Sequence, residues 1–185
     1  MIFESLILAF FIGFLRKGKI KNLEKLYIRG WYFLVAGLII EIISLLIITR
    51  TEWKLADIIE ISFPLIHIII YMFLLVGLTL NIREKGFLIS AVGAFLNFLA
   101  LLFNNGKMPV SPKSLEISKL FTQLTLLKDN RILTHSLINH NTRFSFFCDI
   151  IPVVRPFPKI ISIGDIFIAL GLFIVIQSYM TRKKT

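Results

Sequence analysis

The chain has 185 residues, of which 56% are hydrophobic and only 17% are charged, and its mean hydropathy is +0.82. This composition excludes an ordinary soluble domain and predicts one all-α, multi-pass membrane domain over residues 1–185, with room for about five membrane helices and one sizeable loop. The net charge of +10 then indicates basic residues that flank membrane spans and contact anionic lipid, so membrane lipids are an expected partner and nucleic acid is not.

The apolar segments predict about five membrane spans. They cover approximately residues 2–15, 31–49, 58–80, 87–103 and 161–179. The first has no basic residue before it, a basic block after it and no small-x-small cleavage site, so we expect a retained span rather than a secretory signal. Trp31 and Tyr32 begin the second span as an interfacial aromatic pair.

A long loop, residues 104–160, separates the last two predicted spans. Asn104-Asn105-Gly106 is typical of a turn, and Ser111-Pro112 predicts an N-cap followed by proline at the first helical position. The apolar residues that follow recur at helical spacing, which predicts one amphipathic helix lying on the membrane or covering the bundle. These residues are Ile117, Leu120, Phe121, Leu124 and Leu127.

The distribution of basic residues predicts the orientation in the cell membrane. The densest short-loop charge lies between the first two spans, in residues 16–29, and the C-terminal tail is also basic. A five-span bundle puts both on one side. The positive-inside rule therefore places the N-terminus outside, the C-terminus in the cytoplasm and the long loop outside.

Polar residues inside or at the edges of the apolar spans suggest a site, because ionisable groups are costly in hydrocarbon. They are Glu41, Glu60, His67, Asn97 and Asp165. In the expected orientation they converge on the outer half of the bundle. We therefore predict a polar pocket below the long loop, with Asn105 of the turn as a further binding residue.

The third span carries a polar stripe, because Glu60, Pro64, His67 and Tyr71 are spaced to share one helical face. One interpretation is structural: the Glu and His satisfy each other or a backbone carbonyl. The other is a proton-handling or ligand-binding wall, since histidine titrates near neutral pH. Glu41 is either buried and neutral or paired with His67, and a proton-coupled carrier would use these same two groups.

Two aspartates, Asp149 and Asp165, lie at the outer membrane boundary. Paired carboxyl groups a few ångströms apart can share a proton and activate water, which suits hydrolysis of an amide bond at the bilayer surface. In the alternative interpretation, Asp149 caps a turn and Asp165 caps the last helix. His135 and His140 match no zinc spacing, so no metal and no cofactor is expected.

Three segments carry a resemblance to a known family. Asn105 to Ser111, Cys148 to Pro152 and Ser162 to Gly171 resemble a domain-of-unknown-function family of small multi-spanning bacterial membrane proteins, over essentially the whole chain. The resemblance implies the architecture and marks these segments as characteristic. It implies no activity.

A second group of segments is similar to lipoprotein signal peptidase, a membrane aspartyl protease. Asn104-Asn105-Gly106, Asp149 and Ser162-Ile163-Gly164-Asp165 follow the order of its Asn-x-Gly turn, its aspartate before an extended stretch, and the Asn-x-Ala-Asp start of its last span. However, the span number differs, and Thr142 stands where the Asn-x-x-Asp-Arg motif has its aspartate. The similarity therefore implies a catalytic dyad only if Asp149 supplies the missing carboxyl group.

The absence of a complete catalytic motif favours a non-enzymatic component of the bacterial envelope, with a polar pocket that binds a small ligand or another membrane protein. The first alternative is a membrane-embedded aspartyl-type hydrolase that uses Asp149 and Asp165. The second is a proton-coupled carrier that uses Glu41 and His67.

Overall fold

The computed structural model describes residues 1–50 and 54–182, and its main elements within these ranges are helical. The long helices are α1 (Ile2–Leu15), α2 (Trp31–Arg50), α3 (Lys54–Thr79), α4 (Phe87–Leu102) and α7 (Ile163–Met180). The shorter helical elements are η1 (Ile20–Lys25), α5 (Pro112–Ile117), α6 (Phe121–Lys128) and η2 (Ser145–Phe147). The strands are β1 (Met108–Val110), β2 (His135–Leu137), β3 (Ile151–Val153) and β4 (Lys159–Ile161).

The long helices follow the predicted apolar segments and make this an all-α membrane protein. Within the described residues, α2, α3 and α7 are long and apolar enough to cross a membrane. The apolar helices α1 and α4 have 14 and 16 residues, which at 1.5 Å per residue is about 21 and 24 Å. That is less than the hydrocarbon thickness of about 30 Å. A topology with five spans therefore stays a prediction.

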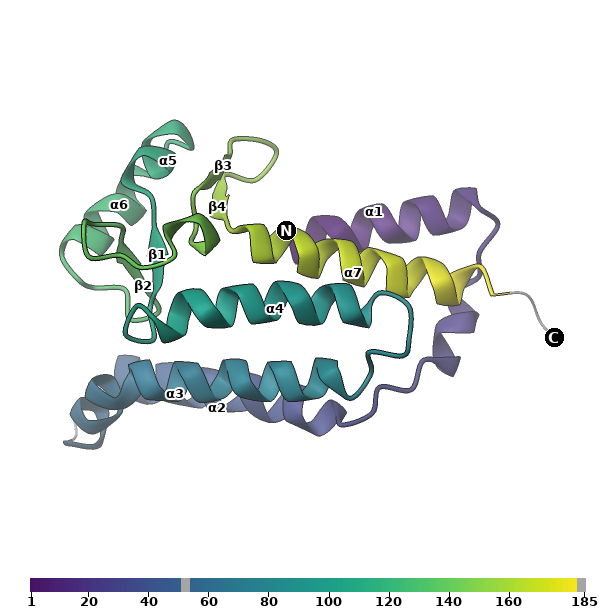
Figure 1. Cartoon of the computed structure of the whole chain (residues 1–185), viewed down its shortest axis with the longest axis horizontal. Helices are drawn as coiled ribbons and strands as arrows, with labels where there is room; N and C mark the ends of the chain where they lie inside the picture. The colour runs from purple at the N-terminus through teal and green to yellow at the C-terminus, as the bar shows by residue number, and fades with distance from the viewer. Residues whose placement is uncertain (51–53, 183–185) are drawn as a thin grey trace.

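The long helices pack side by side in the order α2, α3, α4, α7 and α1, which differs from their order in the chain (Figure 1). α4 packs between α3 and α7, α2 packs on the outside of α3, and α1 packs on α7. The outer helices expose many of their large apolar side chains, among them Phe11 of α1 and Ile42 of α2. This exposure is expected of helices that face lipid rather than water.

Glycines permit the close approach of α4 and α7. A Cβ on Gly164 would overlap the carbonyl oxygen of Gly93 and Oδ1 of Asn97, and a Cβ on Gly171 would overlap Oγ of Ser90. Small residues at a helix interface let the two backbones approach, as is common in membranes. This contact brings Asn97 next to the first turn of α7.

Residues 104–160 form a folded cap over one end of the bundle, with β1 parallel to β2 and β3 antiparallel to β4. The predicted N-cap is confirmed, because Ser111 Oγ accepts a hydrogen bond from the backbone N–H of Ser114 (3.2 Å). The prediction of one amphipathic helix is wrong. Lys119 has a φ of +57° and separates α5 from α6, so that Leu115, Leu124 and Leu127 converge on a core within the cap.

Candidate functional site

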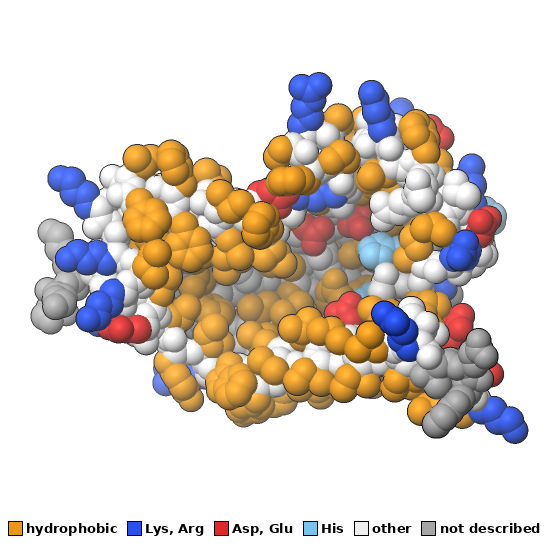
Figure 2. All heavy atoms as spheres, turned by 180° about the vertical axis from the view of Figure 1, so that it is seen from behind, with side chains coloured by type: hydrophobic (Ala, Val, Ile, Leu, Met, Phe, Trp, Pro, Cys, Tyr) orange, Lys and Arg blue, Asp and Glu red, His pale blue; other side chains and the backbone are white. Residues whose placement is uncertain are grey.

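A cavity of about 310 Å³ lies between the cap and the helices. Five residues predicted for the site line it: Glu41, His67, Asn97, Asp149 and Asp165. The remaining lining side chains are Ile70, Tyr71, Leu74, Met108, Thr134 and His135. Figure 2 shows acidic and imidazole side chains beside the cap, next to a hollow with apolar walls. Residues from α2, α3, α4, α7 and the cap therefore meet at one place.

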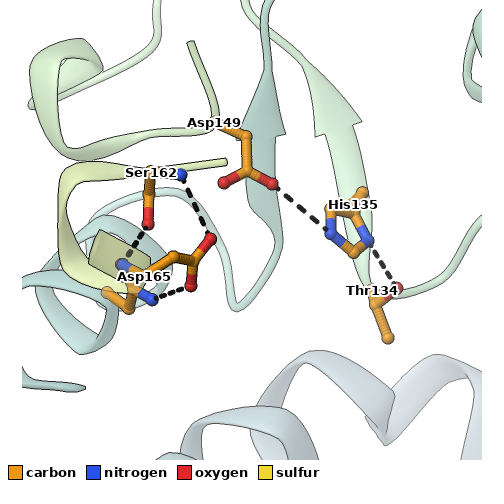
Figure 3. Close-up of polar contacts among 6 residues, drawn as sticks. Thr134, His135, Asp149, Ser162 and Asp165 are labelled. Atoms are coloured by element: carbon orange, nitrogen blue, oxygen red, sulfur yellow. Dashed lines mark hydrogen bonds and ion pairs between the residues drawn. The ribbon is translucent and has the colours of Figure 1, made fainter. Parts of the chain in front are cut away.

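Asp165 is held by a closed ring of hydrogen bonds (Figure 3). Its Oδ1 accepts from Nδ2 of Asn97 (3.0 Å) and its Oδ2 accepts from the backbone N–H of Ser162 (3.1 Å). Ser162 Oγ accepts from the backbone N–H of Asp165 (3.0 Å) and donates to Oδ1 of Asn97 (2.8 Å). The interpretation of Asp165 as a cap of the last helix is thus confirmed, as a capping box. Both carboxylate oxygens accept N–H donors, and the same carboxylate borders the cavity.

Asp149 is positioned by its backbone, which continues the pairing of the cap strands. Its N–H donates to the carbonyl of Pro109 (3.0 Å), and its carbonyl accepts from the N–H of Ser111 (2.9 Å). The side chain is 11% exposed and points into the space that Asp165 borders (Figure 3). Burial, together with the charge of Asp165, raises the pKa of Asp149 to about 8. At neutral pH this carboxyl group therefore holds a proton.

His135 of β2 stands beside Asp149. Its Nε2 is 3.8 Å from Oδ2 of Asp149, which is longer than a hydrogen bond, and its Nδ1 is 2.7 Å from Oγ1 of Thr134 (Figure 3). Burial lowers the pKa of His135 to about 4. The imidazole is then uncharged at neutral pH, as is Asp149, so the two groups are neutral neighbours rather than an ion pair.

His67 lies on the α3 side of the cavity and is 6% exposed. Its Nδ1 is 2.8 Å from the carbonyl oxygen of Gly106 in the turn after α4. A carbonyl oxygen only accepts, so the proton of the neutral imidazole lies on Nδ1 and Nε2 is free of it. This confirms the structural interpretation in which a backbone carbonyl satisfies the histidine. Tyr71 packs edge-on against the His67 ring.

Two predicted binding residues lie outside this cavity. Glu60 is exposed and borders a separate hollow with Asp57 and Lys107, because it lies on α3 near the cap end and outside the bundle. Asn105 is exposed, with a φ of +55°, and is part of the turn that ends α4. The turn prediction is confirmed. These placements separate both residues from the Asp149 and Asp165 pair.

Ser162 and Thr134 belong to the site but were not singled out from the sequence. The Ser-x-x-Asp spacing of Ser162 and Asp165 is the pattern of a capping box and was the available signal. Thr134 carried none. In the part of the chain that the structure describes, no group of three or more His, Cys, Asp or Glu side chains has an arrangement suited to a metal ion.

Comparisons with known proteins identify a family and a relative of this chain. Residues 25–177 match a family described as a family of unknown function, DUF5317. An uncharacterized protein of Thermotoga maritima is 27% identical over 176 residues, which is 94% of this chain and 89% of that protein. No solved structure matches. These comparisons do not show the fainter similarity to lipoprotein signal peptidase. On the match over most of its length, the chain belongs to the family of unknown function DUF5317.

Proposed function

We propose that this protein is a membrane-embedded hydrolase of the aspartyl type, and that Asp149 and Asp165 cleave an amide bond at one face of the membrane. The observation that carries the proposal is the unequal environment of two carboxyl groups on one cavity. Asp165 accepts two N–H donors, whereas Asp149 has a pKa raised to about 8. Pairs of carboxyl groups whose environments differ in this way divide the roles of acid and base.

The chemistry follows from these two states. The Asp165 carboxylate takes a proton from a water molecule as its oxygen attacks the carbonyl carbon of the substrate. The Asp149 carboxyl group donates its proton to the carbonyl oxygen, which leaves a neutral tetrahedral diol. When the C–N bond breaks, the amine nitrogen receives a proton from Asp165, and Asp149 recovers its proton from the diol hydroxyl that becomes the carbonyl oxygen of the new carboxylic acid. Water adds across the amide bond and both carboxyl groups return to their initial states.

The position of the cavity supports a substrate that reaches the membrane surface. It lies where the apolar helices end and the folded cap begins, next to a hollow with apolar walls (Figure 2). An amide bond inside an apolar span cannot reach water. At the boundary between the apolar helices and the cap, the amide bond of a membrane-anchored substrate can reach both the two carboxyl groups and solvent. In the orientation expected from the basic residues, with the N-terminus outside, this is the outer face.

The experiment compares the wild type with Asp149→Asn and Asp165→Asn in a bacterial host. New N-termini of membrane proteins are identified by mass spectrometry, which we choose because it does not require a known substrate. The matched control is Asp129→Asn, since Asp129 is an exposed residue at the end of α6 outside the cavity. We expect N-termini that depend on both Asp149 and Asp165 and persist in the control.

A cleaved peptide from that experiment then serves as the probe for the purified protein. In water enriched in ¹⁸O, direct attack of water puts one ¹⁸O into the new carboxyl group in the first turnover. New N-termini that are the same in the wild type and both asparagine variants, or no wild-type turnover of the identified peptide, contradict the hydrolase proposal.

The second candidate is a non-enzymatic binder of a small polar ligand. It is favoured by the convergence of three carboxyl and two imidazole side chains on a cavity of ligand size: Glu41, His67, His135, Asp149 and Asp165. A binder would be stabilised by its ligand without turnover, and Asp165→Asn would weaken that stabilisation. A carrier that uses Glu41 and His67 remains a further proposal. Proton-dependent uptake that Glu41→Gln leaves unaltered would argue against it.

A further inference from the structure

A second pocket, of about 650 Å³, lies at the end of the bundle opposite the cap. Four cationic side chains line it: Arg16 after α1, Arg83 and Lys85 in the turn between α3 and α4, and Arg182 after α7. Glu84 is the acidic residue on the same lining. Within residues 1–50 and 54–182, no carboxylate forms an ion pair with any of the four cations.

Contacts with neighbouring residues order this pocket. Arg16 donates through Nη1 to Oε1 of the buried Gln177 (3.1 Å), whose Nε2 donates to the carbonyl of Ala9. The guanidinium of Arg182 lies 5.7 Å from the ring centre of Tyr179. Tyr179 in turn donates to Oε2 of Glu84 (3.0 Å), so the acidic residue is already occupied. The pocket therefore presents partly fixed cations with an excess of positive charge.

Arginine and lysine around a pocket suit a phosphate group, because guanidinium groups bind its oxygens through paired N–H donors and lysine adds a point charge. The lining of the pocket also has an apolar part. Phe173 and Ile174 lie further along α7 toward the centre of the bundle and line its apolar part. Phe173 also lines an apolar groove of about 410 Å³ between α1 and α7. The cationic pocket and the apolar groove therefore adjoin at Phe173.

We propose that this pocket binds one anionic phospholipid, with its phosphodiester headgroup among the four cations and an acyl chain against Phe173. General attraction of basic residues to an acidic membrane surface is diffuse and depends on total charge. The proposed site is local and depends on which cations are present. The proposal is independent of the hydrolase chemistry, since the cap and its carboxyl groups lie at the other end of the helices.

The test uses the purified full-length protein in detergent, titrated with dioleoyl phosphatidylglycerol or dioleoyl phosphatidylcholine and observed by native mass spectrometry. The pocket variant is Arg83→Gln with Lys85→Gln. The control is Lys21→Gln with Lys25→Gln, which removes the same charge from exposed residues of η1 outside the pocket lining. Both pairs are exposed, so we expect both variants to fold.

In the wild type and the control, we expect the first phosphatidylglycerol to bind about tenfold more tightly than phosphatidylcholine, because only the phosphatidylglycerol headgroup brings a net negative charge to the cations. The pocket variant should lose most of that preference. An equal loss in both variants would mean diffuse attraction and overturn the site, as would equal affinity for the two lipids in the wild type. Displacement of the lipid by millimolar inorganic phosphate would overturn the lipid assignment in favour of a soluble anion.

Discussion

Substitution of Ser162 by alanine tests the ring of hydrogen bonds that holds Asp165. The hydroxyl of Ser162 has two roles, since it accepts from the N–H of Asp165 at the start of α7 and donates to Oδ1 of Asn97. Ser162 is fully buried and Asn97 is 1% exposed, so water does not replace the lost partner. Alanine removes the helix cap and leaves the Asn97 carbonyl oxygen without its donor.

The magnitude follows from these two losses. Loss of a serine N-cap costs about 1 kcal/mol. A buried acceptor left without a partner costs about 1–3 kcal/mol, although hydrogen bonds measured within a membrane protein average only about 0.6 kcal/mol. We therefore expect the free energy of unfolding to decrease by about 2 kcal/mol. This value is smaller than the cap cost plus the largest buried-acceptor cost, and larger than the average for a hydrogen bond in a membrane protein. The change adds no bulk, so steric strain does not contribute.

The assay is reversible unfolding of the purified protein in mixed micelles with increasing dodecyl sulfate, followed by circular dichroism. Ser178→Ala is the matched control, because Ser178 lies on the same helix but its hydroxyl donates to Val175 within that helix (2.8 Å). We expect the control to change the unfolding free energy by less than about 0.5 kcal/mol. Equal stabilities of the Ser162 and Ser178 variants would refute the argument that the ring holds the first turn of α7.

Three further predictions concern burial and packing. The pKa of Asp149 is raised from 3.8 to about 8, so the folded state favours the protonated carboxyl group. The wild-type unfolding free energy should therefore decrease as the pH rises from 6.5 to 8. Relative to Asp149→Asn, the decrease should be at most about 1.4 kcal/mol per pH unit. His135 has a pKa of about 4 in the folded protein and an ordinary value of 6.5, which is the lower edge of this pH range, so its titration contributes little within the range. Parallel pH profiles of the wild type and Asp149→Asn would contradict the raised pKa of Asp149. Cys148 is the single cysteine, and burial raises its pKa to about 12, so N-ethylmaleimide at pH 7.5 should modify it only after unfolding; rapid labelling of the folded protein would show that the thiol is accessible. Gly164→Ala should destabilise the protein by about 1–3 kcal/mol, because the added Cβ overlaps α4. Gly37→Ala is the control and should not destabilise the protein, because its Cβ would lie 3.5 Å from its nearest neighbour. Equal unfolding midpoints of the two variants would mean that α4 and α7 do not pack as described.

Much of the candidate site could be predicted from the sequence, because a polar residue in an apolar span stands out wherever the helices are placed. Glu41, His67 and Asn97 were identified in this way, and all three border one cavity. Glu60 carried the same signal but lies outside this cavity, because it stands about two turns nearer the N-terminal end of α3 than His67 does. Asp149 could be noted as a boundary aspartate. Its pKa depends on burial between the cap and the long helices, which no local pattern of residues reveals.

Hydrophobicity determined the long helices, and short residue patterns carried the signals for the helix N-caps at Ser111 and Ser162, because both features depend on residues close in sequence. In contrast, tertiary structure decided the fold of the cap formed by residues 104–160. Its apolar residues are spaced for one helix, yet Lys119 separates two short helices so that their leucines bury one another. Likewise, the meeting of Asp149 with Asp165 depends on the pairing of Asp149 with β1 and on the glycine contact between α4 and α7. Contacts between distant segments form only where the whole chain makes their packing favourable, so no single segment specifies them.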